Sequence, residues 1–136
     1  MKTALVAMSL MLLAACAGTP SDVQTRHKPK ESIKMTRTSD CLSESLISGF
    51  QALDDHHLIL FGSGRRKAYL VEIAPACFDM TRQNSLATVD GDNNGQICGF
   101  GTDSIAYEQF GRMERCRVMG MEELSEERLL EVQSRK

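Results

Sequence analysis

The residues that could most readily do chemistry in this chain are the oxygen-bearing side chains between positions 90 and 96. The sequence there reads Asp-Gly-Asp-Asn-Asn-Gly-Gln, which places Asp90, Asp92 and Asn94 at alternate positions. An EF-hand calcium loop has the same pattern, with side-chain oxygens at its first, third and fifth positions, a glycine at the sixth and a backbone carbonyl at the seventh. If calcium binds, we therefore expect Asp90, Asp92, Asn94 and the carbonyl of Gln96 to be its ligands.

The same residues also fit a second interpretation, a tight hairpin loop that holds no ion. The twelfth position of an EF-hand loop is a bidentate glutamate, and here it is Gly101. The preceding run, 85–89, has the pattern of a strand and not of a helix, and Asn94-Gly95 is a favoured turn dipeptide. Both interpretations stay open, and a site that lacks the twelfth ligand would bind calcium weakly, at about millimolar concentration.

Four cysteines follow the first forty residues: Cys41, Cys77, Cys98 and Cys116. No Cys-x-x-Cys occurs and no cysteine has a histidine at ligand spacing, so two structural disulfides are expected in an oxidising compartment. Three pairings are possible. We favour Cys77–Cys98 with Cys41–Cys116, because the second bond would close nearly the whole domain into one loop and long loops gain most stability in the chain-entropy model.

Catalysis has little support in the sequence. Its histidines are His27, His56 and His57, and no Gly-x-Ser-x-Gly element is present to supply a nucleophile. Adjacent histidines on a strand point to opposite faces, so His56 and His57 would not readily hold one metal ion. Gly-Ser-Gly-Arg-Arg-Lys at 62–67 has three bases but no P-loop spacing, and we interpret it as a solvated hairpin tip. We expect no enzyme activity and no cofactor other than weakly bound calcium.

The elements that would position these residues are mainly short strands. Residues 41–53 carry apolar side chains at helical spacing, which predicts a short helix or helical turn. Glu126 and Glu127 behind a capping Ser125 predict a C-terminal helix. Six strands are expected between the two, at 57–61, 67–73, 85–89, 96–100, 104–108 and 116–121. The fold class is therefore mainly β, a small antiparallel barrel or curved sheet with short helices at both ends.

The N-terminus has the pattern of an export signal. Lys2 precedes an apolar run of about ten residues, too short to span a bilayer, and the run ends in Leu-Ala-Ala-Cys. This ending resembles the bacterial lipobox, which implies that residues 1–15 are removed and that Cys16 is acylated. Ala17 in place of aspartate favours the outer membrane. Residues 16–40 hold few apolar side chains and two prolines, so we expect a flexible tether ahead of a domain at 41–136.

The charge distribution indicates which class of partner to expect. The expected domain carries more acidic than basic residues, and its bases are not clustered as phosphate-backbone binding requires. We therefore expect no nucleic acid partner. The anchor implies contact with the membrane, and the remaining expectation is an envelope protein or a glycan.

The ordered cysteine framework resembles a family of small envelope lipoproteins from Gram-negative bacteria, known only as a domain of unknown function. The matching features cover about 41–131: Cys41 ahead of Ile-Ser-Gly-Phe, Pro75-x-Cys77, Gln-Ile-Cys98, Cys116-Arg-Val and Leu-Ser-Glu-Glu at 124–127. The resemblance implies a secreted β-rich domain with paired cysteines and no particular activity. The hypotheses are a non-catalytic lipid-anchored binding or structural module, a calcium-dependent form of it that uses 90–95, and a periplasmic lysozyme-type inhibitor by analogy of fold.

Overall fold

The structure, a computed structural model, describes residues 32–36 and 38–135. Cys16, the expected signal at 1–15 and the first part of the expected tether lie outside these residues. Within the described part of the chain, no helix is both long enough and apolar enough to cross a membrane.

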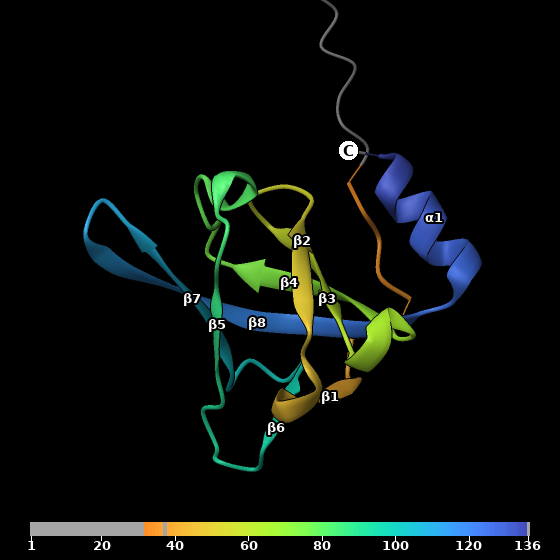
Figure 1. Cartoon of the computed structure of the whole chain (residues 1–136), viewed down its shortest axis with the longest axis horizontal. Helices are drawn as coiled ribbons and strands as arrows, with labels where there is room; N and C mark the ends of the chain where they lie inside the picture. Colours follow the sequence, from red (N-terminus) through yellow and green to blue (C-terminus); the bar gives the residue numbers. More distant parts are fainter. Residues whose placement is uncertain (1–31, 37, 136) are drawn as a thin grey trace, which may run out of the picture. The chain divides into compact units, whose positions relative to one another are not determined.

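Eight strands and one α-helix make up the domain (Figure 1). The strands are β1 (Cys41–Ser43), β2 (Gly49–Ala52), β3 (His57–Phe61), β4 (Ala68–Ala74), β5 (Ala87–Val89), β6 (Gln96–Cys98), β7 (Ser104–Gln109) and β8 (Arg112–Leu124). The helix is α1 (Glu126–Ser134), and single 3-10 turns cover Glu44–Leu46, Ser63–Arg65 and Met80–Arg82.

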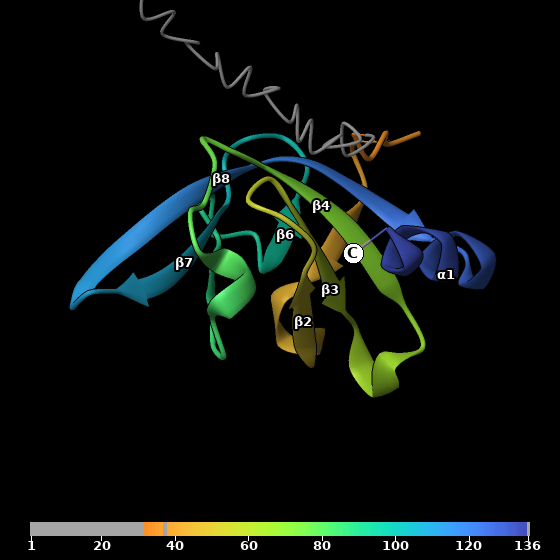
Figure 2. The same cartoon turned by 90° about the horizontal axis from the view of Figure 1, so that it is seen from above.

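Six strands form one antiparallel sheet in the order β2-β3-β4-β8-β7-β5, and β1 pairs with β6 in a separate two-stranded sheet. Strand β8 connects the two halves of the large sheet, since residues 112–117 pair with β7 and residues 117–124 pair with β4. The register shifts between Glu72 and Ile73, and such bulges bend a strand and increase its twist. Figure 2 shows the resulting curl of the sheet. The expected mainly β class is therefore confirmed as a curled half-barrel.

The sheet has an apolar core on each face, because side chains of a strand alternate between faces. The inner core lies in the hollow of the curl and includes Leu58, Leu60, Val71 and Ile73 of β3 and β4. The intervening residues of the same strands belong to a smaller outer core, which Val132 of α1 completes. Since the central residues of β3 and β4 are buried on both faces, both strands contain apolar runs, interrupted in β4 by the exposed Glu72.

The C-terminal helix follows the sequence prediction. The Ser125 hydroxyl accepts the backbone N–H of Arg128 at 3.2 Å, and Glu126 and Glu127 occupy the first turn. Acidic groups at this end interact favourably with the helix dipole. The cap therefore starts α1 where the sequence indicates.

The prediction of a helix at 41–53 was wrong for most of these residues. Residues 41–53 form β1, one 3-10 turn and β2. Leu42 of β1 packs into the inner core, and β1 pairs with β6. Phe50 and Ala52 of β2 pack on the same core, and β2 pairs with β3. The apolar spacing that resembles a helix thus arises from two short strands joined by a turn.

The boundary between tether and domain also needs correction, because the packed part of the chain begins before residue 41. Ile33 and Met35 pack on the outer core. The backbone N–H of Thr36 donates to the Glu122 carboxylate at 2.9 Å, and the Thr36 hydroxyl donates to the same carboxylate at 2.5 Å. The Met121 N–H donates to the Thr38 carbonyl at 3.0 Å, which extends the free edge of β8. Residues 32–36 and 38–40 therefore pack with the domain, which begins before residue 41.

The two expected disulfides are present, but the favoured pairing was wrong. Cys41 is bonded to Cys98, and Cys77 is bonded to Cys116. Cys41 and Cys98 are register partners in the β1–β6 pair, with Cα atoms 4.2 Å apart. Cys77 follows β4 and reaches Cys116 on the inner face of β8. The nested pairing fails because β1 lies beside β6 and not beside the last strand.

Candidate functional site

The loop at 90–96 is closed by its own side chains. Asp90 accepts the N–H of Gly95 at 2.6 Å and that of Asp92 at 3.2 Å. Asp92 in turn accepts the N–H of Asn94 at 3.3 Å, and the Asn94 side-chain oxygen accepts the N–H of Gln96 at 2.7 Å. Aspartate and asparagine commonly close turns in this way. Each of the three predicted side-chain ligands therefore already holds the backbone of the loop.

The hairpin interpretation of this loop was wrong in one respect. Strand β5 pairs with β7, whereas β6 pairs with β1, so the loop joins strands of two different sheets. Gly91 permits the path, because a Cβ there would lie 2.0 Å from the carbonyl oxygen of Thr102. The loop therefore packs directly against the segment that leads into β7.

Asp103 is the residue of this site that sequence reasoning missed. Its side chain is fully buried, and its two carboxylate oxygens accept the N–H of Gly91 at 2.9 Å and of Cys98 at 2.7 Å. A carboxylate oxygen of Asp103 lies within 4.8 Å of those of Asp90 and Asp92. Three carboxylates therefore converge at one end of the loop. Spacing could not indicate Asp103, because it lies two positions beyond the end of an EF-hand loop.

The carboxylates of the half-buried Asp90 and the exposed Asp92 influence each other. Desolvation opposes ionisation of Asp90, but hydrogen bonds led by that of Gly95 lower its pKa below the ordinary value. Desolvation and the hydrogen bond with Asp90 raise the pKa of Asp92. Neighbouring carboxylates behave in this way when one ionises before the other. A cation between them would favour the ionised form of both.

The histidine pair holds the turn between β2 and β3. Asp54 accepts the backbone N–H groups of His56 and His57, each at 2.8 Å, and Nδ1 of His57 lies 3.0 Å from the same oxygen. Nδ1 of His56 lies 3.4 Å from the Ile73 carbonyl, so the two rings have different partners. Desolvation raises the pKa of Asp54, but the hydrogen bond with His57 and the other contacts outweigh it, so the pKa lies below its ordinary value. The two rings do not converge on one site.

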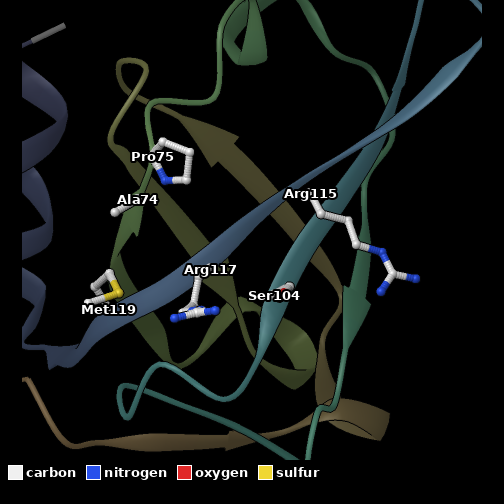
Figure 3. A pocket seen from close by; sticks show the side chains of 6 residues that line it. All are labelled: Ala74, Pro75, Ser104, Arg115, Arg117 and Met119. Atoms are coloured by element: carbon white, nitrogen blue, oxygen red, sulfur yellow. The ribbon is translucent and has the colours of Figure 1, made fainter.

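A pocket of about 480 Å³ opens on the outer face of the sheet, where β4, β7 and β8 run side by side (Figure 3). Six residues line it: Ala74, Pro75, Ser104, Arg115, Arg117 and Met119. Figure 3 shows Arg117 near the centre of the pocket, between Met119 and Ser104, while Arg115 extends over β7. The pocket therefore combines two guanidinium groups with small and apolar neighbours.

The hairpin of β7 and β8 projects from the sheet and ends in apolar side chains. Phe110 at its tip is 94 % exposed, and Met113 and the neighbouring Phe78 are 63 % and 67 % exposed. The Phe78 carbonyl accepts the hydroxyl of Tyr107 at 2.8 Å, which fixes it beside the hairpin. Phe110 and Gly111 both have positive φ, of 50° and 75°, as the two-residue turn of a tight hairpin requires. A phenylalanine is rarely found in that conformation.

The disulfide framework and the curled sheet can be set beside known proteins. A family model described as "Family of unknown function (DUF6491)" matches residues 1–136. The chain belongs to this family. No curated protein and no solved structure matches it. The DUF6491 match confirms the expected membership in a family of unknown function, and any role must be argued from the geometry of the domain.

Proposed function

We propose that this DUF6491 protein is a lipid-anchored, non-catalytic binding module of the cell envelope. The observation that carries the proposal is the exposed Phe110 at the tip of the β7–β8 hairpin, with the exposed Met113 on the same hairpin. Two further features support it. The four domain cysteines form disulfides, which persist in oxidising compartments. The Leu-Ala-Ala-Cys16 sequence supports acylation, and Ala17 supports an outer-membrane location.

The tip is unfavourable for an isolated domain in two ways. Phe110 leaves almost all of its ring in water, and its left-handed backbone strains a side chain that prefers negative φ. Burial of one large apolar side chain on a partner contributes about 1.5–3 kcal/mol. Since the hairpin projects beyond the sheet, the tip can enter a pocket without displacing the core. The partner we propose is an envelope protein with an apolar pocket.

Site-specific crosslinking tests this function. A photo-reactive phenylalanine in place of Phe110, expressed in the native cell, should give a discrete crosslinked species that mass spectrometry identifies. The matched control is the same group at Leu130, an equally apolar and 63 % exposed residue on α1, which lies away from the hairpin in both Figure 1 and Figure 2. Equal crosslinking at both positions, or none at Phe110, would contradict a hairpin-specific partner.

The anchor has a separate test. The native protein should incorporate labelled palmitate, and Cys16→Ser should abolish this incorporation. Two acyl chains suffice for stable anchoring. A native protein that incorporates no palmitate, or a Cys16→Ser protein that still does, would contradict the anchor, whatever the crosslinking result.

A second candidate function is calcium binding, and the convergence of Asp103 with Asp90 and Asp92 favours it. Asp103 would supply the carboxylate that Gly101 cannot supply at the twelfth position. Calorimetric titration should then give heat at millimolar calcium together with a higher melting temperature. Asp92→Asn, which keeps the shape of this exposed side chain, should abolish both effects. The absence of heat and of a thermal shift in the native protein would contradict this function.

A further inference from the structure

Part of the outer sheet face has no other described element packed over it. Helix α1 and residues 33–35 cover the outer core beside β3 and β4. Farther along β8, Cys116 and Val118 belong to the inner core, so the alternating Arg115 and Arg117 face outward. The pocket shown in Figure 3 lies over this part of the face.

The two arginines are the charged side chains of this pocket. Among the described residues, neither Arg115 nor Arg117 takes part in an ion pair, although both are exposed. Residues two apart on a strand are separated by about 7 Å along it, so the like charges repel each other. An anion that binds between them would remove this repulsion.

The floor of the pocket leaves room for such an anion. Ala74 and Ser104 are the register partners of Arg117 on the two neighbouring strands, so Arg117 has a small side chain on each side. Figure 3 shows Ser104 between the two guanidinium groups. Its hydroxyl can donate a hydrogen bond to an anion held there. Arg115 would complete the site by rotating its side chain toward Ser104.

We propose that this pocket binds a phosphate group. A guanidinium is a planar fork that can donate two parallel hydrogen bonds to one anion. A carboxylate holds its oxygens in one plane, whereas a phosphate group spreads its oxygens around a tetrahedron. Both arginines and the Ser104 hydroxyl can therefore approach a phosphate group from different sides. The group can belong to a soluble phosphate or to the phosphodiester of a phospholipid head group, and in both cases the guanidinium groups would contact its charged oxygens. This site is independent of the hairpin tip and of the anchor.

The test uses residues 17–136, exported behind a cleavable leader so that both disulfides form. Titration with inorganic phosphate, followed by nuclear magnetic resonance, should shift the Arg115, Arg117 and Ser104 signals. Cosedimentation with phosphatidylglycerol vesicles, against phosphatidylcholine vesicles, tests the lipid source. Phosphate binding in solution identifies a soluble ligand, whereas binding to phosphatidylglycerol alone identifies the head group.

Variants distinguish specific binding in the pocket from general electrostatic attraction of an anion to a basic surface. Arg117→Gln and Arg115→Gln should each weaken binding by about tenfold or more, since each removes charged hydrogen bonds. Arg117→Lys keeps the charge but loses the fork, and should weaken binding to a smaller extent. Arg112→Gln removes an exposed arginine of β8 outside the pocket and should leave binding unchanged. The proposal is overturned if neither probe binds, or if Arg112→Gln weakens binding as much as Arg117→Gln.

Discussion

One carboxylate oxygen of Asp103 accepts the backbone N–H of Cys98 at 2.7 Å, and both residues are buried. The other oxygen accepts the N–H of Gly91, and the Asp103 carbonyl accepts the N–H of Val118 at 2.8 Å. Asp103 therefore joins the acidic loop, a disulfide-bonded strand and β8. These contacts fasten the loop that joins the two sheets to both of them.

Replacement of Asp103 should be strongly destabilising. Asp103→Ala leaves two N–H groups without acceptors, one of them fully buried, and each such loss costs about 1–3 kcal/mol. We expect the free energy of unfolding to fall by about 2–4 kcal/mol in urea denaturation. Asp92→Ala, on the exposed side of the same loop, should cost much less. A similar loss for both variants would show that Asp103 does not have this role.

Each disulfide should contribute comparably to stability. The bonds close sequence separations of 57 and 39 residues, for which chain entropy gives about 4 kcal/mol each. Paired replacements, Cys41→Ala with Cys98→Ala and Cys77→Ala with Cys116→Ala, should each lower the unfolding free energy by about that amount. Mass mapping of the native protein under non-reducing conditions checks the pairing directly, and a Cys77–Cys98 peptide would contradict it.

Phe110→Asn should change stability and binding in opposite directions. Asparagine tolerates positive φ better than phenylalanine and is favoured in two-residue hairpin turns. We expect the unfolding free energy to rise by about 0.5 kcal/mol or more, in the range by which strained turn residues differ. The in-cell complex found by crosslinking from a neighbouring hairpin residue should be lost. A variant that is more stable yet keeps the complex would remove Phe110 from the binding surface.

The Asp54 turn should make stability depend on acid pH. Because the pKa of Asp54 is lower in the folded chain than in the unfolded chain, its ionised form stabilises the fold above the unfolded value of about 3.9. This contribution disappears as the pH falls through the lower folded pKa. In Asp54→Asn, the melting temperature should therefore fall less steeply below about pH 4 than in the native protein. Identical slopes in a thermal scan series would contradict this role.

Much of the fold follows from local sequence pattern. The apolar run at 57–61 matches β3 at both ends, and Ser125 caps α1 as expected. By contrast, the first four residues of β8 are all exposed and carry no apolar period, so the strand is longer than predicted. Strands β1 and β2 were missed because their apolar spacing also fits a helix, and only the pairing of β1 with β6 distinguishes the two.

The candidate sites were also predictable from the sequence only in part. Asp90 and Asp92 are close in sequence, so their convergence was predictable, whereas Asp103 joins them through a fold-dependent approach. Arg115 and Arg117 alternate with Cys116 and Val118, which is visible in the sequence. That neither arginine forms an ion pair among the described residues depends on which strands flank β8. The disulfide pairing likewise depends on strand neighbours, which cysteine spacing does not encode.

The attachment of Thr36 and of residues 38–40 along β8 gives the domain a mechanical property. A pull on the chain from its N-terminal side first loads the hydrogen bonds of Thr36 with Glu122 and of Thr38 with Met121. The next element is Cys41, whose covalent bond to Cys98 transmits the force to β6. Stretching would detach the residues before Cys41 from β8, and this detachment would stop at the Cys41–Cys98 disulfide. The curled sheet would thus keep its shape under tension that a non-crosslinked edge strand would not withstand.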